Sequence, residues 1–261
     1  MKELLVKFGT ESLLDREGRL DGAIFLEIAR QIVSLMDEGW SVAIVTSGAI
    51  RAGIEEAESV GVSFSGLHKK DYAALGSYRL MRMWSAAFRT HGRCVGQILI
   101  THANLQDSCE KKSIRESMTN LMAAGIIPVL NENDVVSDRE IQTMDAKIGE
   151  NDRLTALISL IINPDIVLSI TSIGGVYDEY PITDRSRMYQ ELDIDNLPAG
   201  IIQPNIKSEN GSGGMSKKIV ALSGCCGDNR IVGIAGWVDD GVICFVMGEV
   251  VGTILGHQNR F

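Results

Sequence analysis

The sequence predicts an α/β protein whose mostly parallel sheet is covered by helices on both faces. Short runs of apolar and β-branched residues alternate along the chain with stretches of helical periodicity. Several of the apolar runs end directly in glycine or small polar residues. Alternating strands and helices build βαβ units, whose parallel strands are buried on both faces. With 261 residues, of which 45% are hydrophobic, the chain is long enough for one large domain, and we treat residues 1–261 as a single domain.

The first two strands and the helix between them are clearly marked. Leu4–Phe8 is an apolar run that ends at a glycine, which is typical of a buried strand that stops in a turn. A helical pattern begins at Asp21 and closes at Gly39, with apolar residues three or four positions apart. Ser41–Val45 is a second β-branched run, and the small residues 46–49 follow it at the start of another helix. The strand–turn–helix unit therefore repeats.

The rest of the chain continues the alternation. Further strands are predicted at Cys94–Ile100, Ile126–Leu130, Ile166–Ile170 and Ile231–Ala235. Helices are predicted at Lys111–Ala124, Leu154–Ile162 and Gly214–Leu222. Val242–Val246 and Val250–Leu255 are interpreted as a closing hairpin around Gly248. Two segments of weak periodicity, Val136–Lys147 and Tyr180–Ser212, are expected to be surface excursions from the core.

Composition narrows the classes of function. The net charge of −9 argues against nucleic acid as a partner, because binding a phosphate backbone requires a clustered basic surface. The N-terminal residues resemble a strand more than a secretory signal, and no apolar run is long enough to span a bilayer. We therefore expect a cytoplasmic protein that contacts neither nucleic acid nor a membrane.

The polar residues with potential chemistry follow the predicted strands. In open α/β sheets ligands bind beyond the carboxyl ends of the strands, and glycine-rich turns before helices let backbone N–H groups approach an anion. Such segments are Lys7–Thr10, Thr46–Ala49, Asn131–Asp134 and Gly211–Met215. A Walker A loop, a GxGxxG fingerprint, a GxSxG elbow and paired metal-binding histidines are all missing from the sequence. Lysines, carboxylates and glycine turns suit phosphoryl transfer, in which positioning and charge stabilisation supply most of the catalysis.

Seven segments, in this order, resemble the successive motifs of the glutamate 5-kinases within the amino-acid kinase family. They are VKFGTESLL (6–14), AIVTSGAIRAG (43–53), AALGSYRLMRMWSAAF (73–88), QILITHANL (97–105), AGIIPVLNENDVV (124–136), KIGENDRLTAL (147–157) and GSGGMSKKIVA (211–221). The resemblance implies a three-layer αβα sandwich around a mostly parallel, eight-stranded sheet. It also implies that ATP and Mg²⁺ are used to convert L-glutamate to γ-glutamyl phosphate, the first step of proline biosynthesis.

The resemblance also assigns roles to residues. Lys7 and Lys218 match the lysines that hold the transferring phosphoryl group, and Asp152 matches the aspartate that orients them. The positions that grip glutamate correspond to Ser47, Asp134 and Asn151. The nucleotide-binding positions correspond to Gly9, Gly48, Thr171, Ser172, Gly213, Gly214 and Met215. No residue is assigned as a metal ligand. The family implies a homo-oligomer, a dimer or tetramer, and functional coupling to a γ-glutamyl phosphate reductase.

The sequence departs from the family pattern at several places. Where relatives read TDxxGLYxxDP, this chain reads TSIGGVYDEYP (171–181), with Ser172 and Tyr180 in place of acids. Glu150 stands in the GDND motif, the segment 134–149 is longer, and the C-terminal PUA domain of many relatives is absent from the sequence. Two alternatives stay open: a superfamily member that acts on another carboxylate, carbamate or phosphate, and a non-catalytic amino-acid or nucleotide sensor. The departure at Ser172 favours the sensor, whereas Lys7, Lys218 and Asp152 argue against it.

Overall fold

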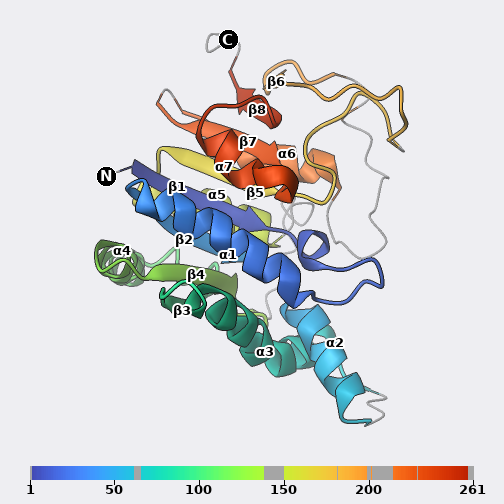
Figure 1. Cartoon of the computed structure of the whole chain (residues 1–261). Helices are drawn as coiled ribbons and strands as arrows, with labels where there is room; N and C mark the ends of the chain where they lie inside the picture. The colour runs from blue at the N-terminus through green and yellow to red at the C-terminus, as the bar shows by residue number, and fades with distance from the viewer. Residues whose placement is uncertain are drawn as a thin grey trace.

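The strands of the chain form one eight-stranded sheet in the computed structural model, which describes residues 2–61, 66–137, 150–180, 182–198, 201, 214–227 and 229–257 (Figure 1). The strands are β1 (Lys2–Phe8), β2 (Trp40–Thr46), β3 (Val95–Ile100), β4 (Ile127–Glu132), β5 (Ile166–Ile170), β6 (Glu191–Asp193), β7 (Ile231–Ala235) and β8 (Gly252–Gly256). The first five predicted strands and the strand at 231–235 are therefore confirmed, with shifts of one or two residues at their ends.

The order of strands across the sheet is β3-β4-β2-β1-β5-β7-β8-β6. β1 lies in the middle and pairs in parallel with β2 on one side and with β5 on the other. Every neighbouring pair is parallel except β7 and β8, which run antiparallel. The mostly parallel sheet is therefore confirmed, and the carboxyl ends of β1, β2, β4 and β5 lie at one edge of it.

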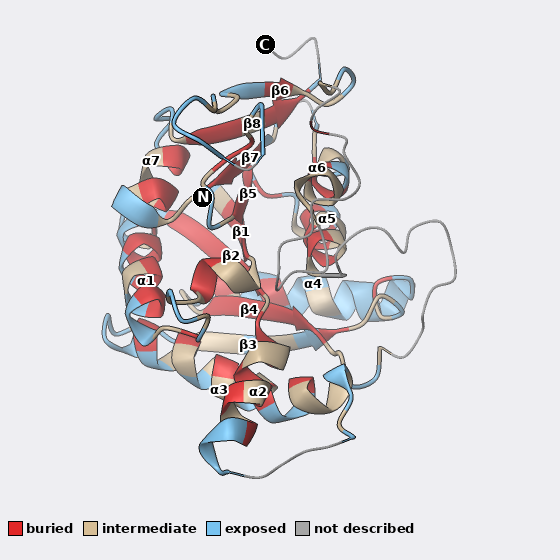
Figure 2. Ribbon diagram, turned by 90° about the vertical axis from the view of Figure 1, so that its right-hand side faces the viewer, coloured by how far each residue is buried: buried red, intermediate tan, exposed pale blue. Residues whose placement is uncertain are grey.

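Helices cover both faces of the sheet and give the expected three layers. They are α1 (Gly22–Asp37), α2 (Ala49–Ser59), α3 (Lys69–Arg89), α4 (Ser108–Ala123), α5 (Glu150–Ile162), α6 (Met215–Ser223) and α7 (Gly241–Val246), with short 3₁₀ turns η1 (Thr10–Leu13) and η2 (Val238–Asp240). Figure 2 shows α1, α3 and α7 on one face and α4, α5 and α6 on the other. None of the helices in the described ranges is both long and apolar enough to cross a membrane.

The alternation of side chains along β1 builds two separate cores. Leu4, Val6 and Phe8 belong to the cluster under α1, α3 and α7, whereas Leu5 belongs to the cluster under α4, α5 and α6. Successive side chains of a strand point to opposite faces, so Lys7 shares the face of Leu5. The sequence of β1 therefore directs the Lys7 side chain toward α5 and α6.

The helix α3 is an element to which the sequence analysis assigned no structure, although residues 73–88 carry one of the family motifs. Its backbone crosses α2 at very short range through two glycines. A Cβ atom at Gly53 would lie 1.8 Å from Tyr72 O, and one at Gly76 would lie 1.9 Å from Ala49 O. This contact leaves no room for a side chain, so the two glycines fix how α2 stands on the sheet and where its N-terminal turn at Ser47 and Gly48 lies.

The predicted closing hairpin is wrong, because Val242–Val246 belongs to the helix α7 rather than to a strand. An apolar run of five residues cannot by itself be assigned to a buried strand or to a buried helix. Two residues with left-handed backbone, Asp239 and Asp240, reverse the chain just before this helix. The buried Gln31 side chain of α1 then accepts a hydrogen bond from Val242 N at 3.0 Å. The second half of the predicted hairpin does form β8, which pairs with β7.

The excursion expected at Tyr180–Ser212 contains a strand of the sheet. β6 pairs in parallel with β8 at the edge of the sheet, and its central Leu192 is buried. A strand of three residues is too short to produce a recognisable period, which explains why the pattern did not predict it. The remainder of this excursion at 202–212, and most of the excursion at Val136–Lys147, lie outside the described residues.

Candidate active site

A cavity of about 480 Å³ opens at the carboxyl-end edge of the sheet, where the sequence predicted a ligand site. It is lined by twelve of the thirteen candidate residues: Lys7, Gly9, Ser47, Gly48, Asp134, Asn151, Asp152, Thr171, Ser172, Gly214, Met215 and Lys218. The thirteenth, Gly213, lies outside the described residues. The fold therefore gathers into one cavity residues that are more than two hundred positions apart in the sequence.

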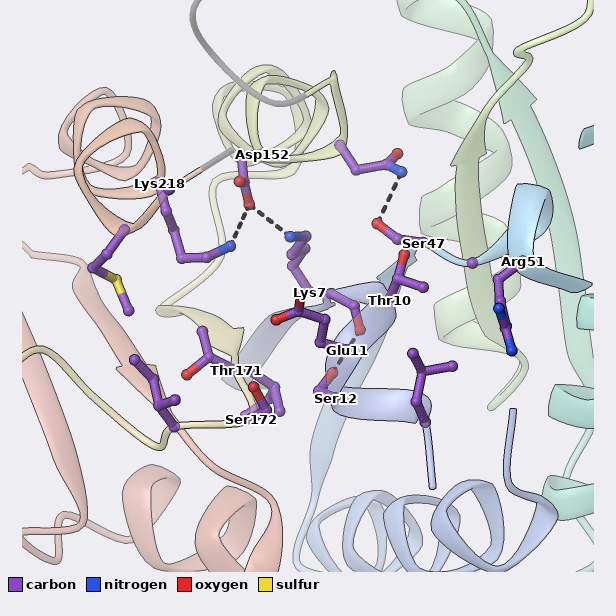
Figure 3. A pocket seen from close by; sticks show the side chains of 18 of the residues that line it. Lys7, Thr10, Glu11, Ser12, Ser47, Arg51, Asp152, Thr171, Ser172 and Lys218 are labelled. Carbon is purple, nitrogen blue, oxygen red and sulfur yellow. Dashed lines mark hydrogen bonds and ion pairs between the residues drawn. The ribbon is translucent and has the colours of Figure 1, made fainter. Parts of the chain in front are cut away.

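Two lysines meet at one aspartate on the wall of this cavity. Lys7 Nζ lies 2.7 Å and Lys218 Nζ 2.8 Å from the same oxygen, Oδ1 of Asp152. Lys7 comes from β1, Asp152 from the first turn of α5 and Lys218 from the first turn of α6. Figure 3 shows the two side chains approaching the carboxylate from opposite sides. Only 5% of Lys7 and 7% of Asp152 are exposed, so these two residues are almost entirely shielded from solvent.

Burial and mutual repulsion set the protonation states of this cluster. Burial and the neighbouring Lys218 ammonium lower the pKa of Lys7 to about 8, although Asp152 acts in the opposite direction. Burial alone would raise the pKa of Asp152, but the two ammonium groups outweigh it and hold that pKa well below its ordinary value. With two cations against one anion, the cluster is positively charged at neutral pH and can attract an anionic group in the cavity.

Ser47 and Asn151 form a second polar pair beside the lysines. Asn151 Nδ2 donates to Ser47 Oγ at 3.0 Å, and Asn151 Oδ1 accepts from Glu132 N at 3.4 Å. Ser47 is held in turn by its backbone N–H, which donates to Phe8 O at 3.1 Å. Because Asn151 and Asp152 are consecutive, the first turn of α5 supplies both the pair with Ser47 and the partner of the lysines.

A residue that sequence reasoning left without a role, Asn131, also lines the cavity. It is 6% exposed, and its Oδ1 has no hydrogen-bond partner among the described residues. Such an orphaned buried oxygen costs free energy unless a ligand or water donates to it. The signal that could have found it was present, since Asn131 begins the polar run that follows a buried strand.

The 3₁₀ turn η1 also contributes residues to which the sequence analysis assigned no role. Thr10, Glu11 and Ser12 all line the cavity directly after Gly9. Ser12 Oγ donates to Gly9 O at 2.7 Å and so closes this turn. Figure 3 shows the Glu11 side chain within the cavity.

The loop after β5 forms the opposite wall of the cavity. Thr171 N donates to Ala235 O at 2.9 Å, and Thr171 Oγ1 accepts from Gly174 N at 3.2 Å. Ser172, which follows, is exposed. The acidic residues farther along are engaged within their own loop: Asp178 Oδ1 accepts from Arg187 N at 2.8 Å, and Glu179 Oε1 accepts from Thr183 Oγ1 at 2.7 Å.

Comparison with known proteins assigns this arrangement to a family. The model of the Amino acid kinase family matches residues 2–232. Glutamate 5-kinase from Shewanella sediminis is 35% identical over 222 residues, which are 84% of this chain and 58% of that protein. Glutamate 5-kinase from Yersinia enterocolitica is 35% identical over 253 residues, which are 96% of this chain and 67% of that protein.

Solved structures agree on the fold. The UMP kinase of Bacillus anthracis has a TM-score of 0.64 at 19% identity, with 98% of this chain and 96% of that chain covered. The UMP kinase of Ureaplasma parvum has a TM-score of 0.62 at 13% identity, with 97% of this chain and 98% of that chain covered. The chain spans 57–58% of the length of the Shewanella relatives that it matches. Because the family model matches residues 2–232, which make up most of the 261-residue chain, the chain belongs to the amino acid kinase family.

Proposed function

We propose that this chain is an ATP-dependent kinase that phosphorylates the γ-carboxylate of L-glutamate to γ-glutamyl phosphate, the first step of proline biosynthesis. The observation that carries the proposal is the convergence of Lys7 and Lys218 on the buried Asp152 beside the cavity. The names of the relatives, glutamate 5-kinase, support the choice of acceptor.

Lys7 and Lys218 are the proposed catalytic cations. A carboxylate acceptor and ATP are both anionic, so the reaction brings like charges together. Two ammonium groups held in advance can stabilise the charge that spreads over the transferring group in the transition state. Asp152 keeps both lysines in place through one shared oxygen and stabilises the protonated form of Lys7. No general base is required, because a γ-carboxylate is already ionised at neutral pH.

Ser47, Asn151 and Asp134 are the proposed acceptor contacts. The Ser47 hydroxyl and the Asn151 amide are already aligned by their mutual hydrogen bond and line the same cavity as the lysines. Asp134 lines the same cavity from the turn after β4. A carboxylate on this side suits the ammonium group of an amino acid, whereas hydroxyl and amide donors suit its carboxylates.

The nucleotide side of the proposal comprises Gly9, Gly48, Thr171, Ser172, Gly213, Gly214 and Met215. Glycines at the start of α2 and α6 allow backbone N–H groups to approach phosphate oxygens closely. Gly48 has a φ of 111°, a left-handed conformation that favours glycine. The cavity volume of about 480 Å³ is in the range of small-molecule sites.

Mg²⁺ is part of the proposal as a partner of the nucleotide. Among the described residues no group of three or more His, Cys, Asp or Glu side chains could hold a metal ion. Mg²⁺ usually binds through substrate phosphates and water with one or two carboxylates, so we propose that the nucleotide supplies most of its ligands. When bound, the ion would neutralise part of the phosphate charge, and Glu11 is a carboxylate of this cavity within the described chain that could hold one of its waters.

The wider setting of the enzyme follows from the same assignment. We propose that it acts in the cytoplasm as a homo-oligomer, a dimer or tetramer. Because an acyl phosphate is readily hydrolysed in water, we propose that the enzyme is functionally coupled to a γ-glutamyl phosphate reductase, which consumes the product.

The test is an acceptor panel with hydroxylamine as the trap. Purified protein with ATP and Mg²⁺ should give a hydroxamate with L-glutamate and little or none with L-aspartate or N-acetylglutamate. UMP serves as a further control, because the UMP kinases share the fold and ADP release reports its phosphorylation. If a hydroxamate forms only with another acid, that acid and not L-glutamate is the acceptor.

A second outcome would remove the catalytic assignment altogether. If calorimetry detects binding of ATP or an amino acid while no acceptor in the panel is phosphorylated, the chain is a sensor. The exposed Ser172, where relatives carry an acid, is the observation that makes this outcome worth measuring.

A further inference from the structure

The buried carboxylate of Glu132 has no role in the function proposed above. It stands at the end of β4, only 3% of it is exposed, and it is not among the residues that line the cavity. A carboxylate in such a place loses much of its hydration, which costs free energy unless close partners replace the water. Its partners therefore indicate what it does.

Two side chains from different loops converge on one oxygen of Glu132. Ser137 Oγ donates a short hydrogen bond to Oε1, and His102 Nδ1 lies 3.3 Å from the same atom. Burial would raise the pKa of the Glu132 carboxyl, but His102 and Ser137 outweigh burial and hold this pKa below its ordinary value. Glu132 is thus ionised at neutral pH, and a hydrogen bond to a charged group is stronger than one between neutral groups.

Ser137 closes the turn that carries the proposed acceptor residue Asp134. Val136 N and Ser137 N both donate to Asn133 O, at 3.1 Å and 3.0 Å. The intervening apolar side chains add little, since Val135 and Val136 are 47% and 63% exposed. Besides these backbone hydrogen bonds, the Ser137 hydroxyl on Glu132 joins the far end of the turn to the end of β4.

The backbone of Glu132 also contacts Asn151, another of the proposed acceptor residues. Its N–H donates to Asn151 Oδ1 at 3.4 Å, which leaves Asn151 Nδ2 directed at Ser47. The next residue, Asn133, donates its N–H to Ile100 O at 2.9 Å and joins the end of β4 to β3. Glu132 thus connects the Asp134 turn to the Asn151 amide, and the residue after it joins the same end of β4 to the neighbouring strand.

We propose that Glu132 and Ser137 form a clasp that positions Asp134, and thereby sets how tightly the acceptor acid is held without taking part in the chemical step. The clasp is the hydrogen bond between the Ser137 hydroxyl and the Glu132 carboxylate. This inference rests on the proposed function for its kinetic consequence, but the closing of the turn is a property of the protein without any ligand.

The test compares Ser137→Ala with Ser137→Thr in the full chain. Ser137→Ala should raise the KM for the acceptor about 10-fold, the size expected for one lost hydrogen bond, and leave kcat and the KM for ATP within twofold. Ser137→Thr keeps the hydroxyl and should restore the acceptor KM. Ser59→Ala, which removes an exposed serine hydroxyl bonded to Glu56 O at the far end of α2, is the matched control and should change nothing.

Amide hydrogen exchange supplies a measurement that does not depend on catalysis. In Ser137→Ala, peptides that cover residues 133–137 should exchange about 10-fold faster than in the wild type, and in Ser137→Thr they should not. If the wild type neither binds nor phosphorylates L-glutamate, the proposed function is wrong while the exchange result still decides the clasp. If the amide exchange of residues 133–137 is the same in Ser137→Ala as in the wild type, the clasp is wrong. It is also wrong if Ser137→Ala lowers kcat and raises the KM values for ATP and for the acceptor to the same extent.

Discussion

The Lys7–Asp152–Lys218 cluster and the Thr171–Tyr180 loop line the same cavity but are built in different ways. In the cluster, three elements contribute one charged group each, and both lysines depend on a single buried oxygen. In the loop, Ser172 is exposed, and the acids Asp178 and Glu179 are bonded within the segment 178–187. A change in the cluster leaves an uncompensated buried charge, whereas a change in the loop is buffered by solvent. The difference explains why departures from the family pattern can collect in the loop.

The largest effect should come from removing a lysine of the cluster. Lys218→Ala or Lys7→Ala should lower kcat by about 10²-fold or more, comparable to the loss of one preorganised electrostatic donor. Steady-state kinetics with L-glutamate would measure it, and circular dichroism would establish that the fold survives. Lys217→Ala is the control, because Lys217 neighbours Lys218 on α6 but is not among the residues that line the cavity. A near-normal kcat for either cluster variant would remove that lysine from the mechanism.

The next effect concerns the polar pair beside the cluster. Asn151→Ala should raise the KM for L-glutamate about 30-fold, since a lost hydrogen bond to a charged group costs ~2 kcal/mol. Ser47→Ala should give a smaller rise in the same direction, because Asn151 keeps its bond to Glu132 N. The KM for ATP should stay within twofold in both variants. An effect on ATP alone would move the pair to the nucleotide side.

The shared carboxylate predicts a pH dependence of a definite sign. Since the pKa of Lys7 is about 8, this lysine loses its charge as the pH rises through that value. We expect kcat/KM, which reports the free enzyme, to fall about 10-fold per pH unit above pH 8. Asp152→Asn removes the charge that raises the pKa of Lys7, so the decline should begin at lower pH. An alkaline limb that does not move in Asp152→Asn belongs to another group.

Part of this site could be predicted because strand geometry is local. The alternation in Leu4–Phe8 fixes which face Lys7 uses, and the glycine after it marks the end of the strand. The sharing of one oxygen of Asp152 by two lysines could not be predicted, because it depends on how the first turns of α5 and α6 meet on one face of the sheet. The resemblance supplied those residues without their geometry.

The failures also have physical causes. Val242–Val246 is a helix whose first turn is bonded to a distant residue: Gln31 of α1, 211 positions away in sequence, accepts from Val242 N, and no local pattern could show this contact. Helix α3 could have been predicted, because its buried residues Leu80, Trp84 and Phe88 recur at helical spacing. Its close crossing with α2 through two glycines could not, because no local pattern shows which helices meet. The polar run after β4 already pointed to Asn131, but the fold was needed to show that its side-chain oxygen is buried without a hydrogen-bond partner among the described residues.

The smallest effect should come from the exposed loop, at Ser172. An aspartate at this position could accept hydrogen bonds from ribose hydroxyls of the nucleotide, and serine loses any charge assistance. Because Ser172 is exposed, solvent reduces the gain, and Ser172→Asp should tighten ATP binding only about 5-fold, or ~1 kcal/mol. Calorimetric titration of ATP into the wild type and the variant would measure the change, with kcat unaltered.

A rebuilt loop is the competing explanation for the missing acid. Asp178 lines the cavity, but its Oδ1 already accepts from Arg187 N, so it is committed to holding the loop rather than the nucleotide. Asp178→Ala should therefore weaken ATP binding less than Ser172→Asp strengthens it. The opposite result, an unchanged affinity in Ser172→Asp with a clear loss in Asp178→Ala, would mean that Asp178 has taken over the role of the acid. The loop would then bind the nucleotide through a different acidic residue. It would differ from the lysine cluster in that its binding residue can change position, whereas the cluster keeps the same three charged residues.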